Sequence, residues 1–380
     1  MPMAELERYG HGGDRLTAAE RFGGRPEEFL DFSSNIHPLG PPPRVLEALS
    51  RALAGERPQA LASYPDPLSR RLRDKLADRL SVSPEQLLVA NGAAELIDLV
   101  VRVFRPRRVG VVHPCFSEYE RAAHLHGCSV VSVRAKEENR FVPTEEELRF
   151  LVMRSDLVFL GCPNNPNGLL PPKPVLERVA AEAARSGAVL VLDEAFIDFV
   201  PGGEERSLIH RLSSCPTTLI FRSMTKFYAL PGLRLGYAVG RKDWIERLLD
   251  HKVPWSVNAL AQVAGEAALE DEEYRRRAER WGRAEREELA GWLRQVGAVD
   301  VFPSETNFLL LRLRAAKGRG ASGRLQERMG RRGILIRDAS TFPGLDDRYV
   351  RIAVRTRREN ERLIAALRKV WAEWGGGGEG

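Results

Sequence analysis

The chain has 380 residues, of which 43% are hydrophobic and 29% charged, a balance typical of globular proteins with a large core. Its formal net charge is +6, but the basic residues are spread through helical stretches. We therefore attribute the positive charge to solvated helix faces and to sites for anionic small molecules, and we expect no nucleic-acid partner. No run approaches the roughly 18 apolar residues of a membrane span, and Met1–Gly10 has no apolar signal segment, so we expect a cytoplasmic protein with no membrane partner. The four cysteines form no CxxC pair and the histidines lack zinc-ligand spacing, so no metal site is expected.

We expect an N-terminal arm followed by two domains. Residues 1–45 carry His11-Gly12-Gly13 and a proline-rich exit, which favour extended chain and an arm that packs with the smaller domain. Helical spacing begins at about Arg44, and Tyr64 follows in a turn with two prolines.

Residues 46–282 are predicted to form the larger domain, an α/β fold with a mainly parallel sheet. Short runs rich in Val, Leu and Ile alternate with helical spacing, and such continuously apolar strands are typical of sheets covered on both faces. The predicted strands are 86–90, 109–112, 129–133, 157–161, 188–192, 218–221 and 235–239. In sheets of this kind, ligands gather at the carboxyl ends of the strands.

The chain changes character after a helical region that runs from 241 to about 296 and breaks near 254–258. Shorter strands are predicted at 299–302, 308–311, 333–336 and 350–354, with helices near 322–331 and 357–374. We therefore expect residues 283–374 to form a smaller α+β domain, followed by a disordered tail at 375–380.

Polar side chains follow three predicted strands of the larger domain. Asn165, Asp193 and Lys226 each lie just past an apolar run, so we expect them to meet over one pocket. Asn and Asp are common loop formers, and only the three residues together indicate a site. Burial between apolar flanks would depress the pKa of Lys226 and make its amine a usable nucleophile.

An anion site is predicted beside the same lysine. The hydroxyl groups of Ser223 and Thr225 and the guanidinium of Arg234 would suit a phosphate. The strand–turn–helix connection at Asn91-Gly92-Ala93-Ala94 would add backbone N–H groups, although an ordinary connection has the same pattern. An amine nucleophile next to an anion site suggests pyridoxal 5'-phosphate held as a Schiff base.

With these motifs the chain resembles the fold-type I pyridoxal-phosphate enzymes of the class I and II aminotransferase superfamily over nearly its whole length. The Ser-x-Thr-Lys stretch with Arg234, the Asn-Pro-x-Gly loop and the Asp-Glu-Ala turn carry the resemblance. It implies an aspartate aminotransferase-like fold in which Lys226 binds the cofactor and then acts as acid and base. Asp193 would pair with the pyridine nitrogen, and Asn165 would donate to the ring O3' atom.

The resemblance also implies the remaining cofactor contacts. Phe116 would stack on the ring, and Tyr64 would reach the cofactor phosphate of the partner subunit in a homodimer. The implied phosphate ligands are Ala93, Ala94, Ser223, Thr225 and Arg234.

Substrate contacts are implied on the arm and in the smaller domain. Arg351 matches the arginine that binds the substrate α-carboxylate in a bidentate manner. Arg337 matches an arginine that contacts a substrate phosphate, with a surface ion pair to Asp338 or a neighbour as the alternative. The further candidates are Asn35, His11 and Arg355. For His11 the alternative is a structural role in the arm, and for Arg355 it is an ion pair behind the site.

Two groups of the superfamily that handle phosphorylated substrates match best: the threonine-phosphate decarboxylases of cobalamin biosynthesis and the histidinol-phosphate aminotransferases. The opening His11-Gly12-Gly13 followed by Asp31–Ile36 is similar to the first group. Phe196 stands where the aminotransferases usually have Tyr, and the run Arg351–Arg355 has an Arg where they usually have Gly. These features favour the decarboxylases.

We therefore predict a lyase that decarboxylates L-threonine O-3-phosphate to (R)-1-aminopropan-2-ol O-phosphate. The alternative is a histidinol-phosphate aminotransferase that depends on 2-oxoglutarate. One fold can perform either reaction, because the bond that lies perpendicular to the cofactor ring is the one that breaks. A non-catalytic binding module is disfavoured by the presence of Lys226, Asp193 and Asn165 together.

Overall fold

The computed structural model describes residues 6–7, 11–314 and 320–375. The chain divides into two compact units: unit 1 is Met1–Pro38, Asn165–Leu169 and Arg280–Gly380, and unit 2 is Leu39–Asn164 and Leu170–Glu279. The loop Asn165–Leu169 thus belongs to unit 1, although the sequence analysis includes it in the larger domain. Of the predicted tail at 375–380, all but the first residue lies outside the described residues.

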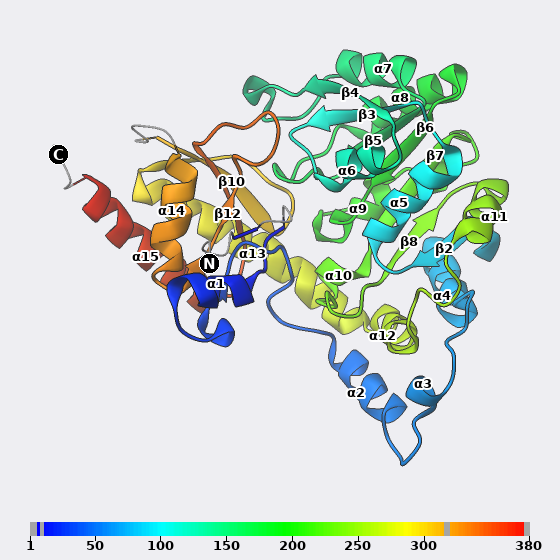
Figure 1. Cartoon of the computed structure of the whole chain (residues 1–380), viewed down its shortest axis with the longest axis horizontal. Helices are drawn as coiled ribbons and strands as arrows, with labels where there is room; N and C mark the ends of the chain where they lie inside the picture. The colour runs from blue at the N-terminus through cyan, green and yellow to red at the C-terminus, as the bar shows by residue number, and fades with distance from the viewer. Residues whose placement is uncertain (1–5, 8–10, 315–319, 376–380) are drawn as a thin grey trace. The chain divides into compact units, whose positions relative to one another are not determined.

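Unit 2 is built on a seven-stranded sheet with the order β2-β8-β7-β6-β5-β3-β4 (Figure 1). The strands are β2 (Leu87–Ala90), β3 (Arg108–His113), β4 (Ser129–Arg134), β5 (Leu157–Gly161), β6 (Val189–Asp193), β7 (Thr218–Ser223) and β8 (Gly236–Val239). β3 to β7 run parallel, whereas β8 is antiparallel to its neighbours β2 and β7. The predicted α/β fold with a mainly parallel sheet is confirmed.

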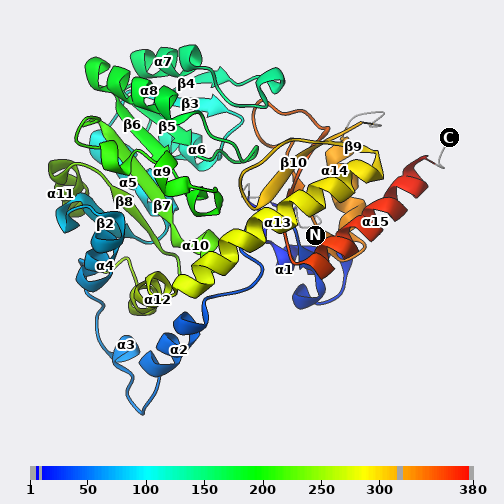
Figure 2. The ribbon, with the colours of Figure 1, turned by 180° about the vertical axis from the view of Figure 1, so that it is seen from behind.

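Helices lie on both faces of this sheet, as the opposite views in Figures 1 and 2 show. The helices are α2 (Pro43–Ala52), α3 (Gln59–Ala62), α4 (Arg70–Leu80), α5 (Ala93–Phe104), α6 (Glu118–Leu125), α7 (Glu145–Arg154), α8 (Lys173–Ser186), α9 (Gly203–Arg206), α10 (Met224–Phe227), α11 (Lys242–His251), α12 (Ala259–Leu269) and the first part of α13 (Glu272–Val296). Single 3-10 turns occupy Pro84–Gln86, Glu137–Asn139, Ile197–Phe199 and Ile209–Arg211. Because β5 and β6 are buried along their whole length, their sequences are unbroken apolar runs up to the strand ends.

Unit 1 contains a four-stranded antiparallel sheet, β12-β13-β10-β9, and a parallel pair, β1-β11. The strands are β1 (Leu30–Asp31), β9 (Val299–Val301), β10 (Phe308–Leu313), β11 (Ile334–Leu335), β12 (Arg337–Asp338) and β13 (Tyr349–Ala353). The helices are α1 (Arg15–Phe22), α14 (Ala321–Gly330), α15 (Arg357–Gly375) and the rest of α13, with a 3-10 turn at Pro26–Glu28. Phe32 of the arm is fully buried in the same apolar core as Leu309, Ile352 and Leu363, so the arm is part of this unit.

Two elements differ from the sequence prediction. The arm, expected to be extended, contains α1, which begins where the Asp14 carboxylate accepts a hydrogen bond of 3.0 Å from the Thr17 N–H. The long helical region has a second break between α12 and α13, where Asp271 accepts a hydrogen bond of 3.0 Å from the Tyr274 N–H. In both places an aspartate marks the start of a helix that hydrophobic spacing alone did not reveal.

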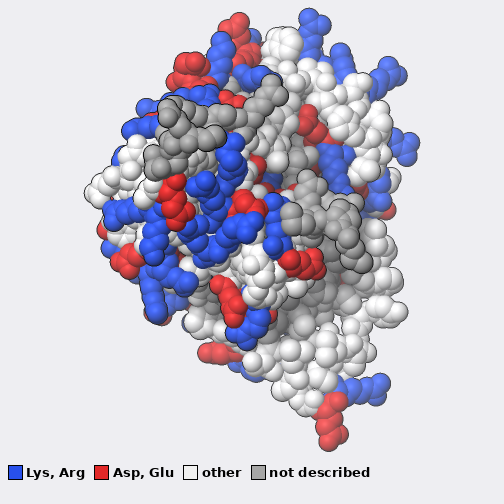
Figure 3. Space-filling model, turned by 60° about the vertical axis from the view of Figure 1, so that its left-hand side comes forward, with Lys and Arg blue, Asp and Glu red and all other residues white. Residues whose placement is uncertain are grey.

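Within the described ranges, no helix has the length and apolar character that a membrane crossing requires. Those residues also include no group of His, Cys, Asp and Glu side chains arranged to hold a metal ion. On the face shown in Figure 3, acidic side chains lie among the basic ones, which agrees with solvated helix faces as the source of the +6 net charge.

A buried ion-pair network joins the strand ends of unit 2. The Arg222 side chain on β7 is 1% exposed, and its Nε donates a hydrogen bond of 2.7 Å to Glu194 Oε2, just past β6. Its two terminal nitrogens donate to Glu204 at 2.9 and 3.2 Å, and Ser207 Oγ donates to Glu194 at 2.9 Å. Burial raises the pKa of Glu194 to about 7, although Arg222 acts in the opposite direction. The Glu194 carboxylate would therefore be costly to bury without the Arg222 guanidinium.

We predict that Arg222→Met lowers the free energy of unfolding by about 3–5 kcal/mol, because it leaves Glu194 buried without its partner. The matched control is Arg241→Met, whose ion pair with Asp243 is half exposed and should contribute less than about 1 kcal/mol. Urea unfolding followed by tryptophan fluorescence measures both variants. Equal, small losses would mean that the network is not needed for stability.

Candidate active site

The carboxyl ends of the parallel strands of unit 2 carry the central residues. In the sheet register, Asp193 at the end of β6 lies opposite Gly161 of β5 and Phe221 of β7. β7 leads directly into α10, the single helical turn in which Lys226 is half-buried. Lys226 is one of the charges that act on the Asp193 carboxylate, so these two predicted residues share one site.

Asp193 is held by two hydrogen bonds. Its Oδ2 accepts a hydrogen bond of 2.7 Å from the Tyr119 hydroxyl, and its Oδ1 accepts one of 3.1 Å from the Ala195 N–H. Burial raises the pKa of Asp193, while the two hydrogen bonds and the charge of Lys226 act against burial. These contacts oppose the effect of burial and fix the orientation of the carboxylate.

Tyr119, the partner of Asp193, was not predicted from the sequence as a site residue. It is 2% exposed, and its ring stacks on Phe159 with centroids 4.9 Å apart and planes 5° apart. The half-buried ring of Phe116, the predicted stacking residue, meets Tyr119 edge-on with centroids 5.7 Å apart. The sequence feature that could have identified Tyr119 is its position at the start of a helix that follows a parallel strand.

The predicted phosphate ligands of unit 2 form a second cluster. Ser223 and Thr225 are buried, and their hydroxyl oxygens lie 2.7 Å apart. α5 begins at Ala93-Ala94 without a side-chain cap, so the N–H groups of its first turn can bind an anion. Gly92 has φ +80°, and a Cβ added there would lie 2.8 Å from Arg234 Nη2. The positive φ is what requires glycine in this turn, and the Arg234 guanidinium lies against it.

Tyr64 is strongly exposed, at 83%. Its ring packs on that of Trp255 with centroids 5.1 Å apart. Other large apolar side chains of unit 2 are also exposed, among them Leu46, Leu53, Leu61, Leu68 and Val253. Exposed apolar surface of this kind often marks an interaction site.

Unit 1 holds the predicted substrate residues. Arg351 on β13 lies opposite Arg337 on β12, and both side chains are buried. Arg351 donates hydrogen bonds of 2.5 Å to Asn165 Oδ1 and 2.6 Å to the Ser33 carbonyl, while its buried Nε has no partner among the described residues. Burial and then the charge of Arg337 lower the pKa of Arg351, and a bound anion would offset both effects.

An ion pair joins Arg337 to the arm. Its guanidinium pairs with the carboxylate of Glu7, and its Nη2 donates to Thr341 Oγ1 at 2.9 Å. Burial raises the pKa of Glu7 to about 7 although Arg337 opposes this. The counter-ion of Arg337 is therefore a carboxylate whose charged form is destabilised by burial. The sequence carried no signal for this contact, because the two residues lie near opposite ends of the chain.

Asn35 and His11 lie in the same unit. Asn35 is 3% exposed, and its carbonyl accepts a hydrogen bond of 3.0 Å from Asn307 Nδ2. Its own Oδ1 is buried and lacks a hydrogen-bond partner among the described residues, as a ligand contact would require. His11 is half-buried in the loop whose Gly13 N–H donates to Ser33 Oγ at 2.8 Å. The loop thus reaches the residue whose carbonyl binds Arg351.

Arg355 is engaged within unit 1. It donates a hydrogen bond of 2.8 Å to Glu359 and one of 3.0 Å to the Asp31 carbonyl. Its guanidinium also lies 5.8 Å from the centre of the Phe32 ring. This arrangement favours the ion-pair alternative for Arg355 over direct contact with a substrate.

The residues of each unit fit pyridoxal 5'-phosphate. Unit 2 supplies an amine at Lys226, a buried carboxylate at Asp193 and, for an anion, the turn at Gly92 with the Arg234 guanidinium against it. In unit 1, Asn165 Oδ1 is held by an arginine, so its amide presents Nδ2 as a donor, as a contact to O3' requires.

The family model described as "Aminotransferase class I and II" matches residues 27–367. The threonine-phosphate decarboxylase of Salmonella typhimurium is 40% identical over 361 residues, which cover 95% of this chain and 96% of that protein. Both matches run through unit 1 and unit 2.

Solved structures show the same likeness. The histidinol-phosphate aminotransferase from Clostridium acetobutylicum has a TM-score of 0.82 and 31% identity, covering 89% of this chain and 98% of that one. The histidinol-phosphate aminotransferase from Sinorhizobium meliloti in complex with pyridoxal-5'-phosphate has a TM-score of 0.80 and 26% identity, covering 90% of each chain. These matches confirm the predicted fold type and cofactor, and the chain belongs to the aminotransferase class I and II family.

Proposed function

We propose that this chain decarboxylates L-threonine O-3-phosphate to (R)-1-aminopropan-2-ol O-phosphate in cobalamin biosynthesis. The observation that carries the reaction type is the 40% identity with a threonine-phosphate decarboxylase over 95% of the chain. The facing pair of buried arginines, Arg337 and Arg351, supports the substrate class. A substrate with both a phosphate and a carboxylate supplies an anion to each of them.

Arg351 binds the substrate α-carboxylate in this proposal, and Arg337 binds the phosphate. The phosphate takes the place of Glu7, whose charged form burial already disfavours. A phosphate dianion brings more charge and more acceptor oxygens than a carboxylate, so it competes well for the guanidinium. Asn35 Oδ1, buried and without a partner among the described residues, is a further acceptor for a substrate proton donor.

The chemistry uses the strand-end residues of unit 2. When bound, pyridoxal 5'-phosphate supplies the electron sink for the bond that breaks. Asp193, oriented by the Tyr119 hydroxyl, would pair with the ring nitrogen and favour its protonated form. Lys226 anchors the cofactor and delivers the proton that replaces the carboxylate on the substrate α-carbon. Ser223, Thr225 and Arg234 hold the cofactor phosphate, together with the first N–H groups of α5.

Substrate orientation selects decarboxylation over transamination. The Cα–carboxylate bond must stand perpendicular to the ring, and the carboxylate is the group that Arg351 binds. Hydrogen bonds to Asn165 and Ser33 fix that guanidinium within unit 1. Phe196 is 6% exposed and has no hydroxyl, so Asn165 is the proposed side-chain donor to O3'.

The second candidate function is a histidinol-phosphate aminotransferase. The observation in its favour is the TM-score of 0.82 with the Clostridium enzyme, at 31% identity. The two reactions share the cofactor residues and the arginine pair, so only the products distinguish them.

We also propose a cytoplasmic homodimer. The exposed Tyr64–Trp255 pair and the apolar residues exposed around α2 and α3 support this proposal, because burying them would remove apolar surface from water. Tyr64 would then reach the cofactor phosphate of the partner subunit. Light scattering should give twice the chain mass of 42.5 kDa, and a monomeric mass would contradict the dimer.

With purified holoenzyme and O-phosphothreonine, we predict carbon dioxide release that does not depend on 2-oxoglutarate. Carbon dioxide capture and mass spectrometry of the amine product measure the reaction. Lys226→Ala should release none and should lose the visible absorbance of lysine-bound cofactor. Glutamate-dependent transamination of imidazole-acetol phosphate, with no carbon dioxide released, would instead establish the second candidate.

We predict that Arg351→Ala raises the KM for O-phosphothreonine about a hundredfold, because a buried charged contact to the carboxylate is lost. The Kd for cofactor should change by less than about twofold. Arg351→Lys keeps the positive charge but loses the paired N–H donors of the guanidinium, so it should give an intermediate KM. The control is Arg348→Ala, whose ion pair with Asp346 is half exposed. Equal losses of substrate and cofactor affinity in Arg351→Ala would show that the assignment is wrong.

We predict that Tyr119→Phe weakens cofactor binding about tenfold, since the lost hydrogen bond to a charged group is worth about 1.5 kcal/mol or more. Without the hydroxyl, burial raises the pKa of Asp193 further and its ion pair with the ring nitrogen weakens. Titration of dialysed apoenzyme, followed by fluorescence, gives the Kd. Tyr349→Phe in unit 1 is the matched control, and an unchanged Kd in Tyr119→Phe would remove Tyr119 from the site.

A further inference from the structure

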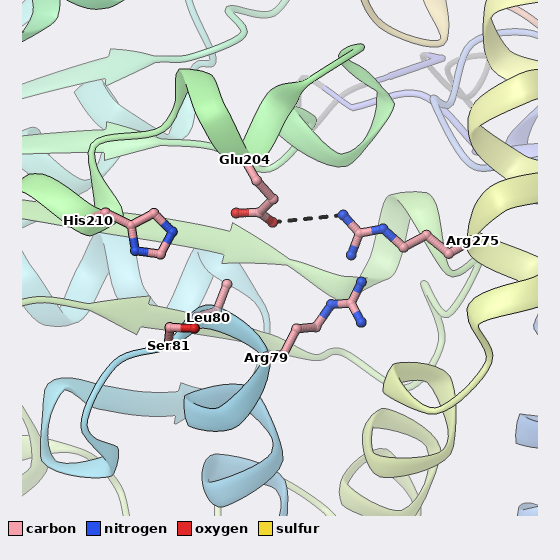
Figure 4. Close-up of a pocket in the computed structure, with 6 residues that line it drawn as sticks. All are labelled: Arg79, Leu80, Ser81, Glu204, His210 and Arg275. Atoms are coloured by element: carbon pink, nitrogen blue, oxygen red, sulfur yellow. Dashed lines mark ion pairs between the residues drawn. The ribbon is translucent and has the colours of Figure 1, made fainter.

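Unit 2 contains a pocket that none of the proposed catalytic residues lines. Its volume is about 350 Å³, within the range of small-molecule sites. The lining residues come from α4 and its end, from α9, from the 3-10 turn Ile209–Arg211 and from α13: Arg79, Leu80, Ser81, Glu204, His210 and Arg275. Figure 4 shows the guanidinium groups of Arg79 and Arg275 turned toward the same space, with the His210 ring on the opposite side of Glu204.

Basic side chains exceed acidic ones around this pocket. Arg79, Arg275 and His210 line it, whereas Glu204 is its only acidic lining residue. The Glu204 carboxylate already accepts two hydrogen bonds from the buried Arg222, and its nearest distance to Arg275 is 3.9 Å. Burial alone would raise the pKa of Glu204, yet Arg222 and Arg79 lower it below its usual value. The lining itself thus carries two guanidinium groups for one carboxylate, and Asp198 also acts on Arg79.

The other partners of the two arginines lie outside the pocket lining. Arg79 Nη1 donates to Glu272 at 2.5 Å, and Arg275 Nε donates to Glu279 at 2.9 Å. The side chains of Glu272 and Glu279 are about half exposed, so these pairs hold the arginines only weakly. Each pair uses one nitrogen of its guanidinium, and each guanidinium has further N–H donors.

We propose that this pocket is a second anion site, which binds a small phosphate-bearing molecule or free phosphate. Two guanidinium groups from different helices turn toward the same space and can donate to the oxygens of a phosphate, and the Ser81 hydroxyl and the His210 imidazole line the same pocket. The volume admits a small metabolite beyond the phosphate itself. The site lies within unit 2, and its residues are distinct from the proposed substrate arginines of unit 1.

The test is calorimetric titration of the holoenzyme with inorganic phosphate, and separately with glycerol 3-phosphate, in chloride buffer of fixed ionic strength. We compare Arg79→Gln/Arg275→Gln with Arg71→Gln/Arg276→Gln. The control pair lies on the same two helices, is exposed, and removes the same charge. We expect the pocket variant to bind at least tenfold more weakly at one site, and the control to bind like the wild type. Tighter binding of inorganic phosphate would indicate a site for free phosphate, and tighter binding of glycerol 3-phosphate a site for a phosphate-bearing metabolite.

The proposed active site also binds phosphate, so its contribution must be separated. Arg337→Gln removes a contact of that site and leaves the pocket unchanged, so one binding event should persist in it and disappear when Arg79→Gln/Arg275→Gln is added. Persistence of that event in the combined variant would overturn the second site. Failure of the decarboxylation assay would overturn the proposed reaction but leave this result unaffected.

A readout on the wild type keeps the proposal testable if the pocket variant does not fold. Saturating phosphate should slow amide hydrogen exchange in segments 79–83 and 203–211, because the bound anion ties α4 to α9. The matched segment is 145–154, which forms α7 and contains none of the pocket residues. Unchanged exchange in both pocket segments at saturating ligand would contradict the proposal.

Discussion

The strand ends of unit 2 depend on two consecutive carboxylates that are buried only because each has its own partner. Asp193 is bound by Tyr119 from α6, and Glu194 is bound by Arg222 from β7. An unpaired carboxylate in either position would carry a large desolvation cost, so α6, β6 and β7 must keep one arrangement. Lys226 follows β7 by three residues, and the same constraint fixes where its amine lies relative to Asp193. The need to pair these two buried carboxylates thus fixes the relative positions of Asp193 and Lys226, on which the proposed chemistry relies.

Unit 1 presents the opposite electrostatic problem, because it buries two arginines on facing strands. Arg351 and Arg337 repel each other, and the nearby carboxylate of Glu7 is itself destabilised by burial. Such a site gains most from a ligand that brings two negative groups. In the proposed reaction, Asp193 and Lys226 are contributed by unit 2 and the arginine pair by unit 1. The same cofactor residues can serve many reactions, whereas the residues around the arginine pair determine which substrate binds.

Much of this organisation was readable from the sequence. Buried parallel strands are continuous apolar runs, and the residues that end them, such as Asp193 and Lys226, stand out by contrast. The start of α1 and the break before α13 were missed because each depends on one capping aspartate, Asp14 or Asp271. Tyr119 and Glu7 were missed for a different reason. Their partners are distant in the sequence, and no periodic pattern reports a single tertiary hydrogen bond or ion pair.

The structure narrows the residues that can distinguish decarboxylation from transamination. Arg355 marked a difference from the aminotransferases in sequence, but it is tied to Glu359 and to the Asp31 carbonyl. Its influence on a substrate therefore acts through the arm, where Asp31 also anchors Ser33, the residue whose carbonyl binds Arg351. In the proposed function, the arm and Arg355 together fix the guanidinium of Arg351, the group proposed to bind the substrate carboxylate. Rigid placement of that group is what a decarboxylase needs, since it holds the bond to be broken in one orientation.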